Sequence, residues 1–294
     1  MELRELLVEC PDGRVLEVAT LGDPSGHTVV FHHGTPGSTL MVKNFEPLLA
    51  QENFYLVTTS RAGYGRSTRD EGRNVASVVG DVRTALDFLG RDTYAVMGWS
   101  GGGPHALACA ALDAPRCLSA VSLAGVVDVF VDFDWTEGMG PENIEEFELA
   151  KKGGPEYEAH MAEVGELFAG SNEGNIIELF GGLFPDVDKA VLADDKMRAD
   201  FAAAIAHGVS SGWRGFYDDD RAFFTKWGFD PMTISVPVAI WYGDQDLMVP
   251  PTHGAWLASH LPTATALHVP EEGHLSIFAR HFDELTSTLA TAFQ

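Results

Sequence analysis

The chain has 294 residues, of which 45% are hydrophobic and 21% charged, and its formal net charge at pH 7 is −24. It contains no apolar run of the roughly 18 residues that a membrane-spanning helix requires. The negative charge disfavours binding to nucleic-acid phosphates or to anionic lipid surfaces, so neither a nucleic acid nor a membrane is expected as a partner. The length allows one large domain with an insertion or two small domains, and nothing indicates the oligomeric state.

The N-terminus and the cysteines bear on cellular location. The first residues, MELRELLVECPDG, lack the basic region followed by an apolar block that a signal peptide shows, so we expect a cytoplasmic location. Cys10, Cys109 and Cys117 are too few and too unevenly spaced for a disulfide framework or a zinc site. We expect free, buried thiols at all three positions.

The first half of the chain predicts a hairpin followed by alternating strands and helices. Residues 2–9 and 14–21 alternate around the turn CPDG, which is typical of an antiparallel hairpin. Strands are then predicted at TVVFHH, FYLVTTS, YAVMGW and LSAVSLAG, and helices at residues 38–51, 74–90 and 101–113. This alternation predicts an α/β fold, with a mostly parallel sheet covered by helices on both faces.

Strand signals stop at residue 127 and resume near residue 234. Apolar and aromatic residues at helical spacing fill the interval, together with 23 acidic and 8 basic residues. We interpret residues 127–233 as a helical cap inserted into a core domain formed by residues 1–126 and 234–294. Strands follow at VPVAIWYG and TALHVP, and a last helix at about 276–291.

Two features of the predicted cap bear on a binding pocket. The run YDDDRAFF is interpreted as a solvated turn, with an anionic feature near a pocket mouth as the alternative. The cap aromatics either line an apolar pocket or pack the cap onto the sheet. They are Phe130, Phe133, Trp135, Phe168, Trp213, Phe216, Tyr217 and Trp227.

The stretch VMGWSGGGPHALA places Ser100 between an apolar strand and a helix, with Gly98 and Gly102 two residues to either side. A nucleophilic serine on such a junction adopts a strained backbone conformation, and small neighbours let the strand and helix approach closely. The Gly-x-Ser-x-Gly pattern alone is a weak signal, but its position between a strand and a helix favours a catalytic serine over a flexible glycine-rich loop. The backbone N–H of Gly101, at the start of the helix, can face a developing oxyanion.

A catalytic serine needs a base and an acid that orients the base. Asp246 in GDQDLMVP and His274 in EEGHLS each follow a predicted strand, and therefore lie at the same end of the sheet as Ser100. We predict a catalytic triad of Ser100, Asp246 and His274. Asp244, which we assign to shaping the turn, and Asp128, which follows LSAVSLAG, are the alternatives for the acid.

The stretch FHHGTPGS, residues 31–38, predicts the second oxyanion donor. Its glycines and proline can hold a backbone N–H at a fixed angle to a reacting carbonyl. Thr35 is the predicted donor beside Gly101, whereas His32 and His33 are interpreted as structural residues. A plain strand-to-helix turn is the alternative.

In this order, the motifs HHGTPGS, SRAGYGRS, GWSGG, GDQDLMVP and EEGHLS resemble the α/β-hydrolase fold family with a helical cap, over essentially the whole chain. The resemblance implies about eight strands and no metal or organic cofactor. Epoxide hydrolases and haloalkane dehalogenases of similar build have an aspartate where this chain has Ser100. The family usually has an aspartate where this chain has Ser60, so we expect Arg61, Gly63 and Gly65 to remain structural but any ion pair through position 60 to be lost.

Within the family, the similarity points to serine hydrolases, namely carboxylesterases, proline iminopeptidase-like aminopeptidases and carbon–carbon bond hydrolases. We expect hydrolysis of small to medium carboxylic esters through an acyl-enzyme intermediate. One alternative is an aminopeptidase whose acidic cap side chains bind the substrate ammonium. The other is a non-catalytic small-molecule receptor on the same fold.

Overall fold

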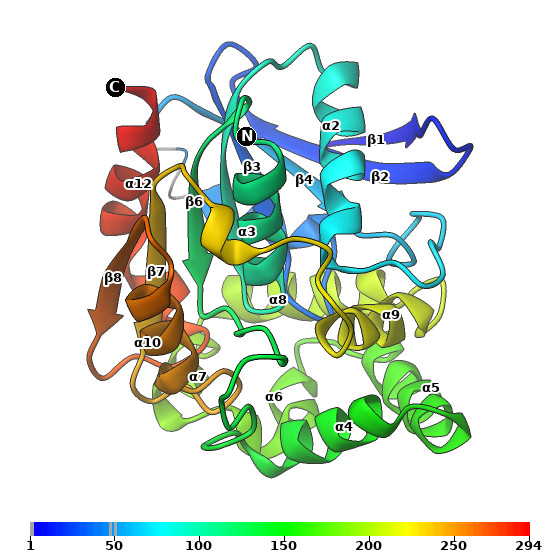
Figure 1. Cartoon of the computed structure of the whole chain (residues 1–294). Helices are drawn as coiled ribbons and strands as arrows, with labels where there is room; N and C mark the ends of the chain where they lie inside the picture. The colour runs from blue at the N-terminus through cyan, green and yellow to red at the C-terminus, as the bar shows by residue number, and fades with distance from the viewer. Residues whose placement is uncertain (1–2, 47–48, 50–51) are drawn as a thin grey trace.

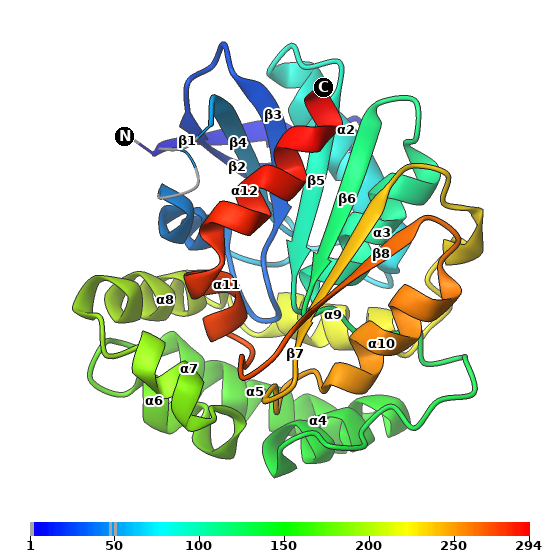
Figure 2. The ribbon, with the colours of Figure 1, turned by 90° about the vertical axis from the view of Figure 1, so that its left-hand side faces the viewer.

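The centre of the protein is an eight-stranded sheet, in a computed structural model that describes residues 3–46, 49 and 52–294 (Figures 1 and 2). The strand order is β1-β2-β4-β3-β5-β6-β7-β8. The hairpin strands β1 (Arg4–Glu9) and β2 (Val15–Gly22) pair antiparallel, and β2 also pairs antiparallel with β4. All other neighbours are parallel. These strands are β3 (His27–His32), β4 (Phe54–Ser60), β5 (Tyr94–Trp99), β6 (Cys117–Leu123), β7 (Val238–Gly243) and β8 (Ala264–Val269).

Helices cover both faces of this sheet, which confirms the predicted α/β fold. In Figure 2, α12 crosses the near face while α2 and α3 lie behind the strands. Strands β4 and β5 are buried along their whole lengths, as expected for central strands of a sheet covered on both faces. The helices outside residues 127–233 are α2 (Val78–Phe88), α3 (Gly102–Leu112), α10 (Pro251–His260), α11 (Ser276–Arg280) and α12 (Phe282–Ala290), with 3₁₀ turns η1 (Thr39–Phe45), η2 (Val75–Ser77) and η5 (Thr291–Phe293). Two further 3₁₀ turns, η3 (Gly181–Leu183) and η4 (Pro231–Thr233), lie within residues 127–233.

The predicted helix over residues 38–51 begins as the 3₁₀ helix η1, and residues 47–48 and 50–51 lie outside the described residues. The hydroxyl of Ser38 accepts a hydrogen bond from Leu40 N and donates one to Ala204 O. These contacts of the Ser38 hydroxyl cap the first turn of η1 and hold it against residue 204 of the chain. In the part of the chain that the structure describes, no helix combines the length and apolar character needed to span a bilayer.

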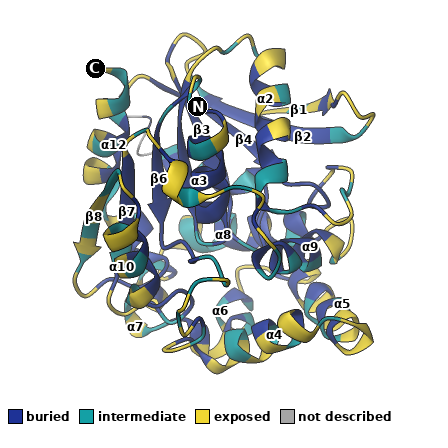
Figure 3. Cartoon of the chain, in the orientation of Figure 1, coloured by how far each residue is buried: buried dark blue, intermediate teal, exposed yellow. Residues whose placement is uncertain are grey.

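Between β6 and β7 the described chain forms helices and loops, which lie across the carboxyl ends of the parallel strands (Figures 1 and 2). We call residues 127–233 the cap segment, and its role as a separate cap domain remains a prediction. The sides of α4 and α5 that face away from the sheet are largely exposed, whereas the central strands are buried (Figure 3). The helices are α4 (Pro141–Lys152), α5 (Pro155–Ala169), α6 (Ile176–Leu179), α7 (Asp186–Val191), α8 (Asp195–Gly208) and α9 (Arg214–Phe223).

The interpretation of YDDDRAFF as a solvated turn is wrong. All but the last residue of the run belong to α9, and its three aspartates, Asp218, Asp219 and Asp220, are all buried. The helix approaches the core closely, because a Cβ added at Gly215 would lie 2.5 Å from the carbonyl of Gly63. Carboxylates can be buried in this way when each one meets a specific partner, and arginines of the core domain supply most of these partners.

Glu17 of β2 makes a further contact between the sheet and the cap segment. Its carboxylate is buried, and its Oε1 lies 2.9 Å from Nε2 of His207 and 2.6 Å from Nε of Arg66. Burial alone would raise the pKa of Glu17, but hydrogen bonds from His207, Ser60 and Arg66 outweigh it and lower the pKa to about 2. The ionised form of Glu17 therefore stabilises the folded chain.

We expect Glu17→Gln to lower the free energy of unfolding by about 2 kcal/mol at pH 7. Because the folded-state pKa is depressed, this stabilisation is complete above the ordinary value of 4.5 and is lost as the pH falls toward 2. Urea unfolding at several pH values between 7 and 3 measures the difference from wild type, with the exposed Glu9→Gln on β1 as the control. A difference that stays constant over this range would contradict the assignment.

Candidate active site

Ser100 lies on a tight turn between β5 and α3. Its φ is 57°, in the left-handed region, and its backbone N–H donates to Leu123 O at 2.8 Å. A Cβ added at Gly98 would lie 2.0 Å from Gly102 O, and one added at Gly102 would lie 2.2 Å from His32 O. Only glycine fits at these two positions, so the structure contains the strained strand-to-helix turn that the sequence predicts.

His274 and Asp246 come together at the carboxyl ends of β8 and β7. His274 Nδ1 lies 2.7 Å from Asp246 Oδ2, and both side chains are buried. The other carboxylate oxygen of Asp246 accepts the backbone N–H groups of Met248 and Val249, each at 2.8 Å. Because an ionised carboxylate can only accept, we assign the proton of a neutral His274 ring to Nδ1, which leaves Nε2 as the acceptor atom.

The nitrogen Nε2 of His274 is buried and has no hydrogen-bond partner among the described residues. No hydrogen bond joins it to Ser100 Oγ in that part of the chain. The imidazole packs against Trp99, the residue that precedes Ser100, with ring centroids 5.1 Å apart, and Trp99 Nε1 donates to His274 O at 3.1 Å. Serine–histidine bonds often tighten only in the complex with substrate, so the catalytic pairing of Ser100 with His274 stays a prediction.

The two alternative acids, Asp244 and Asp128, make other contacts. Asp244 is exposed, and its Oδ1 accepts the backbone N–H of Glu271 at 2.7 Å, so it ties two loops together. Asp128 accepts the backbone N–H of Phe130 at 3.0 Å, and burial raises its pKa. Among the described residues, neither aspartate forms a hydrogen bond or ion pair with His274.

The predicted oxyanion residues flank the serine. Gly101 precedes α3, and a Cβ added there would lie 2.3 Å from Thr35 Oγ1. A Cβ added at Gly34 would lie 3.4 Å from the Cβ of Ser100. Thr35 and Gly101 both line the pocket that contains Ser100, and their role as N–H donors remains a prediction. His33 contacts the backbone, with Nε2 accepting from Arg61 N at 3.1 Å.

A buried ion network, which the sequence analysis missed, holds the Thr35 loop. Arg61 donates to Gly34 O at 2.8 Å and to Thr35 Oγ1 at 3.0 Å, and it also pairs with Asp219 of α9. Asp219 accepts from Thr35 Oγ1 at 2.9 Å and pairs with Arg73. Burial would raise the pKa of Asp219, but the two guanidinium groups hold it well below its usual range.

This network changes the expectation about Arg61. Arg61 has an ion pair although residue 60 is a serine, because the cap segment provides one through Asp219, which is 158 positions away in the chain. The signal in the sequence that could have indicated this buried network is the aromatic residues on both sides of the three aspartates. Aromatic residues at these positions are typical of a packed helix and not of a solvated turn.

A family model described as alpha/beta hydrolase fold matches residues 27–280. The chain belongs to the α/β-hydrolase fold family. This membership confirms the family resemblance and agrees with the strand order described above.

Two curated relatives and one solved structure illustrate the range of similar proteins. Epoxide hydrolase B of Mycobacterium tuberculosis is 33% identical over 131 residues, which cover 43% of this chain and about a third, 35%, of that protein. A non-heme haloperoxidase of Rhodococcus erythropolis is 26% identical over 258 residues, covering 83% of this chain and 84% of that protein. An esterase from Exiguobacterium antarcticum superposes with a TM-score of 0.69 at 19% identity over 99% of this chain and all of that one, which shows a shared fold.

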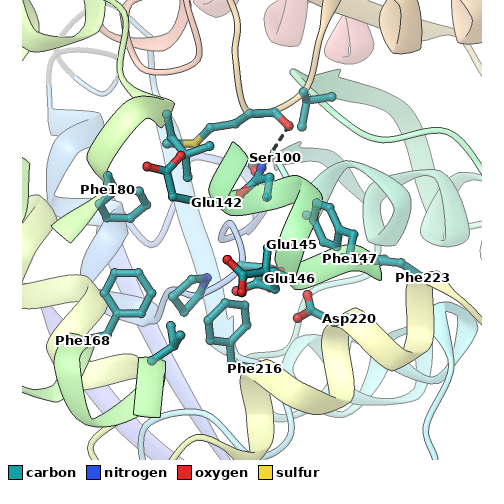
Figure 4. Close-up of a pocket in the computed structure, with 18 of the residues that line it drawn as sticks. Ser100, Glu142, Glu145, Glu146, Phe147, Phe168, Phe180, Phe216, Asp220 and Phe223 are labelled. Carbon is teal, nitrogen blue, oxygen red and sulfur yellow. Dashed lines mark hydrogen bonds between the residues drawn. The ribbon is translucent and has the colours of Figure 1, made fainter. Parts of the chain in front are cut away.

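A cavity of about 210 Å³ in this α/β hydrolase adjoins Ser100 (Figure 4). The cap segment supplies most of its wall. Five phenylalanines line it, namely Phe147, Phe168, Phe180, Phe216 and Phe223. Of the eight cap aromatics considered from the sequence, only Phe168 and Phe216 line this cavity, and the others lie outside its wall.

Within the described ranges, no group of three or more His, Cys, Asp or Glu side chains is arranged to hold a metal ion. Cys10, Cys109 and Cys117 are free and buried, as predicted. Burial raises the pKa of all three thiols, so they are poor ligands and weak nucleophiles.

Proposed function

We propose that this α/β hydrolase cleaves small to medium carboxylic esters, with Ser100 as the nucleophile. The observation that carries the proposal is the 2.7 Å contact between His274 and Asp246, which leaves a buried Nε2 without a partner among the described residues, on a ring that packs against Trp99. An acceptor nitrogen in this position is what a serine needs to lose its proton. The cavity is smaller than the 300–1,000 Å³ typical of drug-sized ligands, which favours short acyl and alcohol groups.

The mechanism follows from these positions. Ser100 Oγ attacks the ester carbonyl while His274 Nε2 accepts its proton, and Asp246 stabilises the resulting imidazolium. The backbone N–H groups of Thr35 and Gly101 stabilise the oxyanion, and losing one such donor typically raises the barrier by about 3 kcal/mol. The imidazolium then protonates the leaving alcohol, and the acyl group remains on Ser100. Water attacks this acyl-enzyme and gives its proton to His274, which releases the acid and restores the hydroxyl.

A second candidate function, hydrolysis of substrates that carry an ammonium group, is favoured by one feature of the pocket. Asp220 is fully buried and lines the cavity, and its Oδ2 accepts from Tyr157 OH at 2.7 Å, while Oδ1 has no hydrogen-bond partner among the described residues. Glu146 of α4 lines the same side of the cavity (Figure 4).

These two carboxyl groups are close enough to perturb each other. Burial raises the pKa of Glu146 to about 8, and burial together with the charge of Glu146 raises the pKa of Asp220. A protonated amine would supply the missing positive charge and a donor for Asp220 Oδ1. An aminopeptidase that binds the free N-terminus of its substrate would use the pair in this way.

One comparison of substrates tests both functions. We expect the protein to hydrolyse 4-nitrophenyl butyrate and to be labelled by a fluorophosphonate on the peptide that contains Ser100. Proline 4-nitroanilide separates the candidates, because its turnover requires the ammonium site as well as the serine. If the second candidate holds, Asp220→Asn raises KM for the anilide about tenfold and leaves KM for the neutral ester unchanged.

Several results would reject these functions. Labelling at a residue other than Ser100, or ester hydrolysis that survives full labelling, would exclude Ser100 as the nucleophile. Absence of both labelling and turnover in the folded protein would favour the receptor alternative. Styrene oxide is a useful control substrate, because Ser100 stands where epoxide hydrolases of similar build have an aspartate, and we expect no turnover of it.

A further inference from the structure

We propose that Asp188, on helix α7 of the cap segment, is a positioning residue that holds His274 in place for proton transfer. The inference rests on the proposed role of His274 as the base. Asp188 Oδ2 accepts the backbone N–H of His274 at 2.9 Å. Its Oδ1 accepts the N–H groups of Leu275 at 3.0 Å and Ser276 at 2.8 Å. One carboxylate from the cap segment therefore binds three successive amides of the loop that carries the base.

These bonds complete the immobilisation of His274. Its amide is held by Asp188, its carbonyl oxygen accepts from Trp99 Nε1, and its Nδ1 contacts Asp246. The three partners come from α7, from the strand that precedes the serine, and from the loop after β7. Of the polar atoms of His274, only Nε2 has no partner among the described residues. Any displacement of the backbone at residue 274 moves this atom relative to Ser100.

The loop is shaped to receive the carboxylate. A Cβ added at Gly273 would lie 2.6 Å from Asp188 Oδ1 and 2.7 Å from Oδ2, so only glycine allows the carboxylate to come this near. Gly273 N in turn donates to Ser276 Oγ at 2.8 Å. The Asp188 carboxylate can therefore lie this close to the loop because its own side chain is short and because Gly273 has no side chain.

The burial of the Asp188 carboxylate indicates that this residue has a role beyond packing. The residue is fully buried, and no Lys or Arg forms an ion pair with it among the described residues. Burial raises the pKa of Asp188, and the amide bonds and the nearby His274 only partly oppose this effect. Packing alone is met at lower cost by an apolar side chain, whereas three amides in a fixed geometry require an acceptor with two oxygens.

Two substitutions at Asp188 test the proposal in the full chain. The carbonyl of Asp188→Asn still accepts from Leu275 and Ser276, but its NH₂ faces the N–H of His274, and we expect kcat for 4-nitrophenyl butyrate to fall about tenfold. Asp188→Ala removes all three acceptors, and we expect a fall of about 100-fold, as for a displacement of about 1 Å at a reacting group. KM should change less than about twofold in both variants. Asp186→Asn, at an exposed position of the same helix, is the matched control and should leave kcat unchanged.

Amide hydrogen exchange separates positioning from general stability. At a temperature where both variants remain folded, we expect the amides of residues 274–276 to exchange faster in Asp188→Ala than in wild type. Faster exchange without a fall in kcat, or a change in KM alone, would overturn the proposal. If wild type does not turn over the ester, the proposed function fails separately, and the rate of fluorophosphonate labelling at Ser100 replaces kcat. An unchanged labelling rate in both variants would then overturn the role of Asp188.

Discussion

Ser100→Ala is expected to lower kcat for ester hydrolysis by about 10⁴- to 10⁶-fold, because the variant has no oxygen to form the acyl-enzyme. The folded structure should be retained. The backbone bonds of residue 100 to Leu123 O and from Gly103 N do not involve the side chain, and alanine meets the same left-handed φ of 57° as serine. Initial rates with 4-nitrophenyl butyrate and a thermal unfolding curve measure the two effects.

The control for this variant is Ser259→Ala, which removes an exposed hydroxyl far along the chain. It should leave both the rate and the unfolding temperature unchanged. If Ser100→Ala kept more than about a hundredth of the wild-type kcat, the hydroxyl at position 100 would not be the nucleophile. A large fall in Tm for Ser100→Ala would mean that the loss of rate reflects unfolding instead.

Asp219→Asn is expected to lower the free energy of unfolding by about 3–5 kcal/mol, the range seen when one partner of a buried ion pair is removed. Arg61 and Arg73 are 1% and 9% exposed, so both would keep a buried positive charge without its counterion. We also expect a lower kcat, because Asp219 accepts from Thr35 Oγ1 and steadies the predicted oxyanion loop. Urea unfolding and ester kinetics on the same preparation measure both.

The neighbouring Asp218→Asn is the matched control. Asp218 pairs with Arg69, whose side chain is 24% exposed, so water can solvate the guanidinium when the carboxylate is removed. We expect Asp218→Asn to cost about 1 kcal/mol and to leave kcat unchanged. Equal costs for the two substitutions would contradict the view that Asp219 is the centre of the network.

Local sequence patterns predicted most of the sheet and the position of the serine. The boundaries of β4 and β5 coincide with the apolar or β-branched runs FYLVTTS and YAVMGW, because strands buried on both faces are rich in such residues. The loops of Asp246 and His274 could be placed because parallel strands carry their carboxyl ends to one edge of the sheet. The glycines on either side of Ser100 predicted its tight turn. At these positions backbone atoms lie too close for any residue with a Cβ.

Only the tertiary structure decided what the charged residues of the cap segment do. The run of three aspartates has the composition of a solvated turn, and Asp188 is one acidic residue among many, yet all four carboxylates are buried. Whether a carboxylate is solvated or buried depends on which partners the fold brings to it. For Asp219 the partner is Arg61, and for Asp188 it is the backbone of residues 274–276. The sequence by itself therefore determined the sheet and the turn that carries Ser100, while the long-range contacts of the folded chain decided which charges support that turn and its histidine.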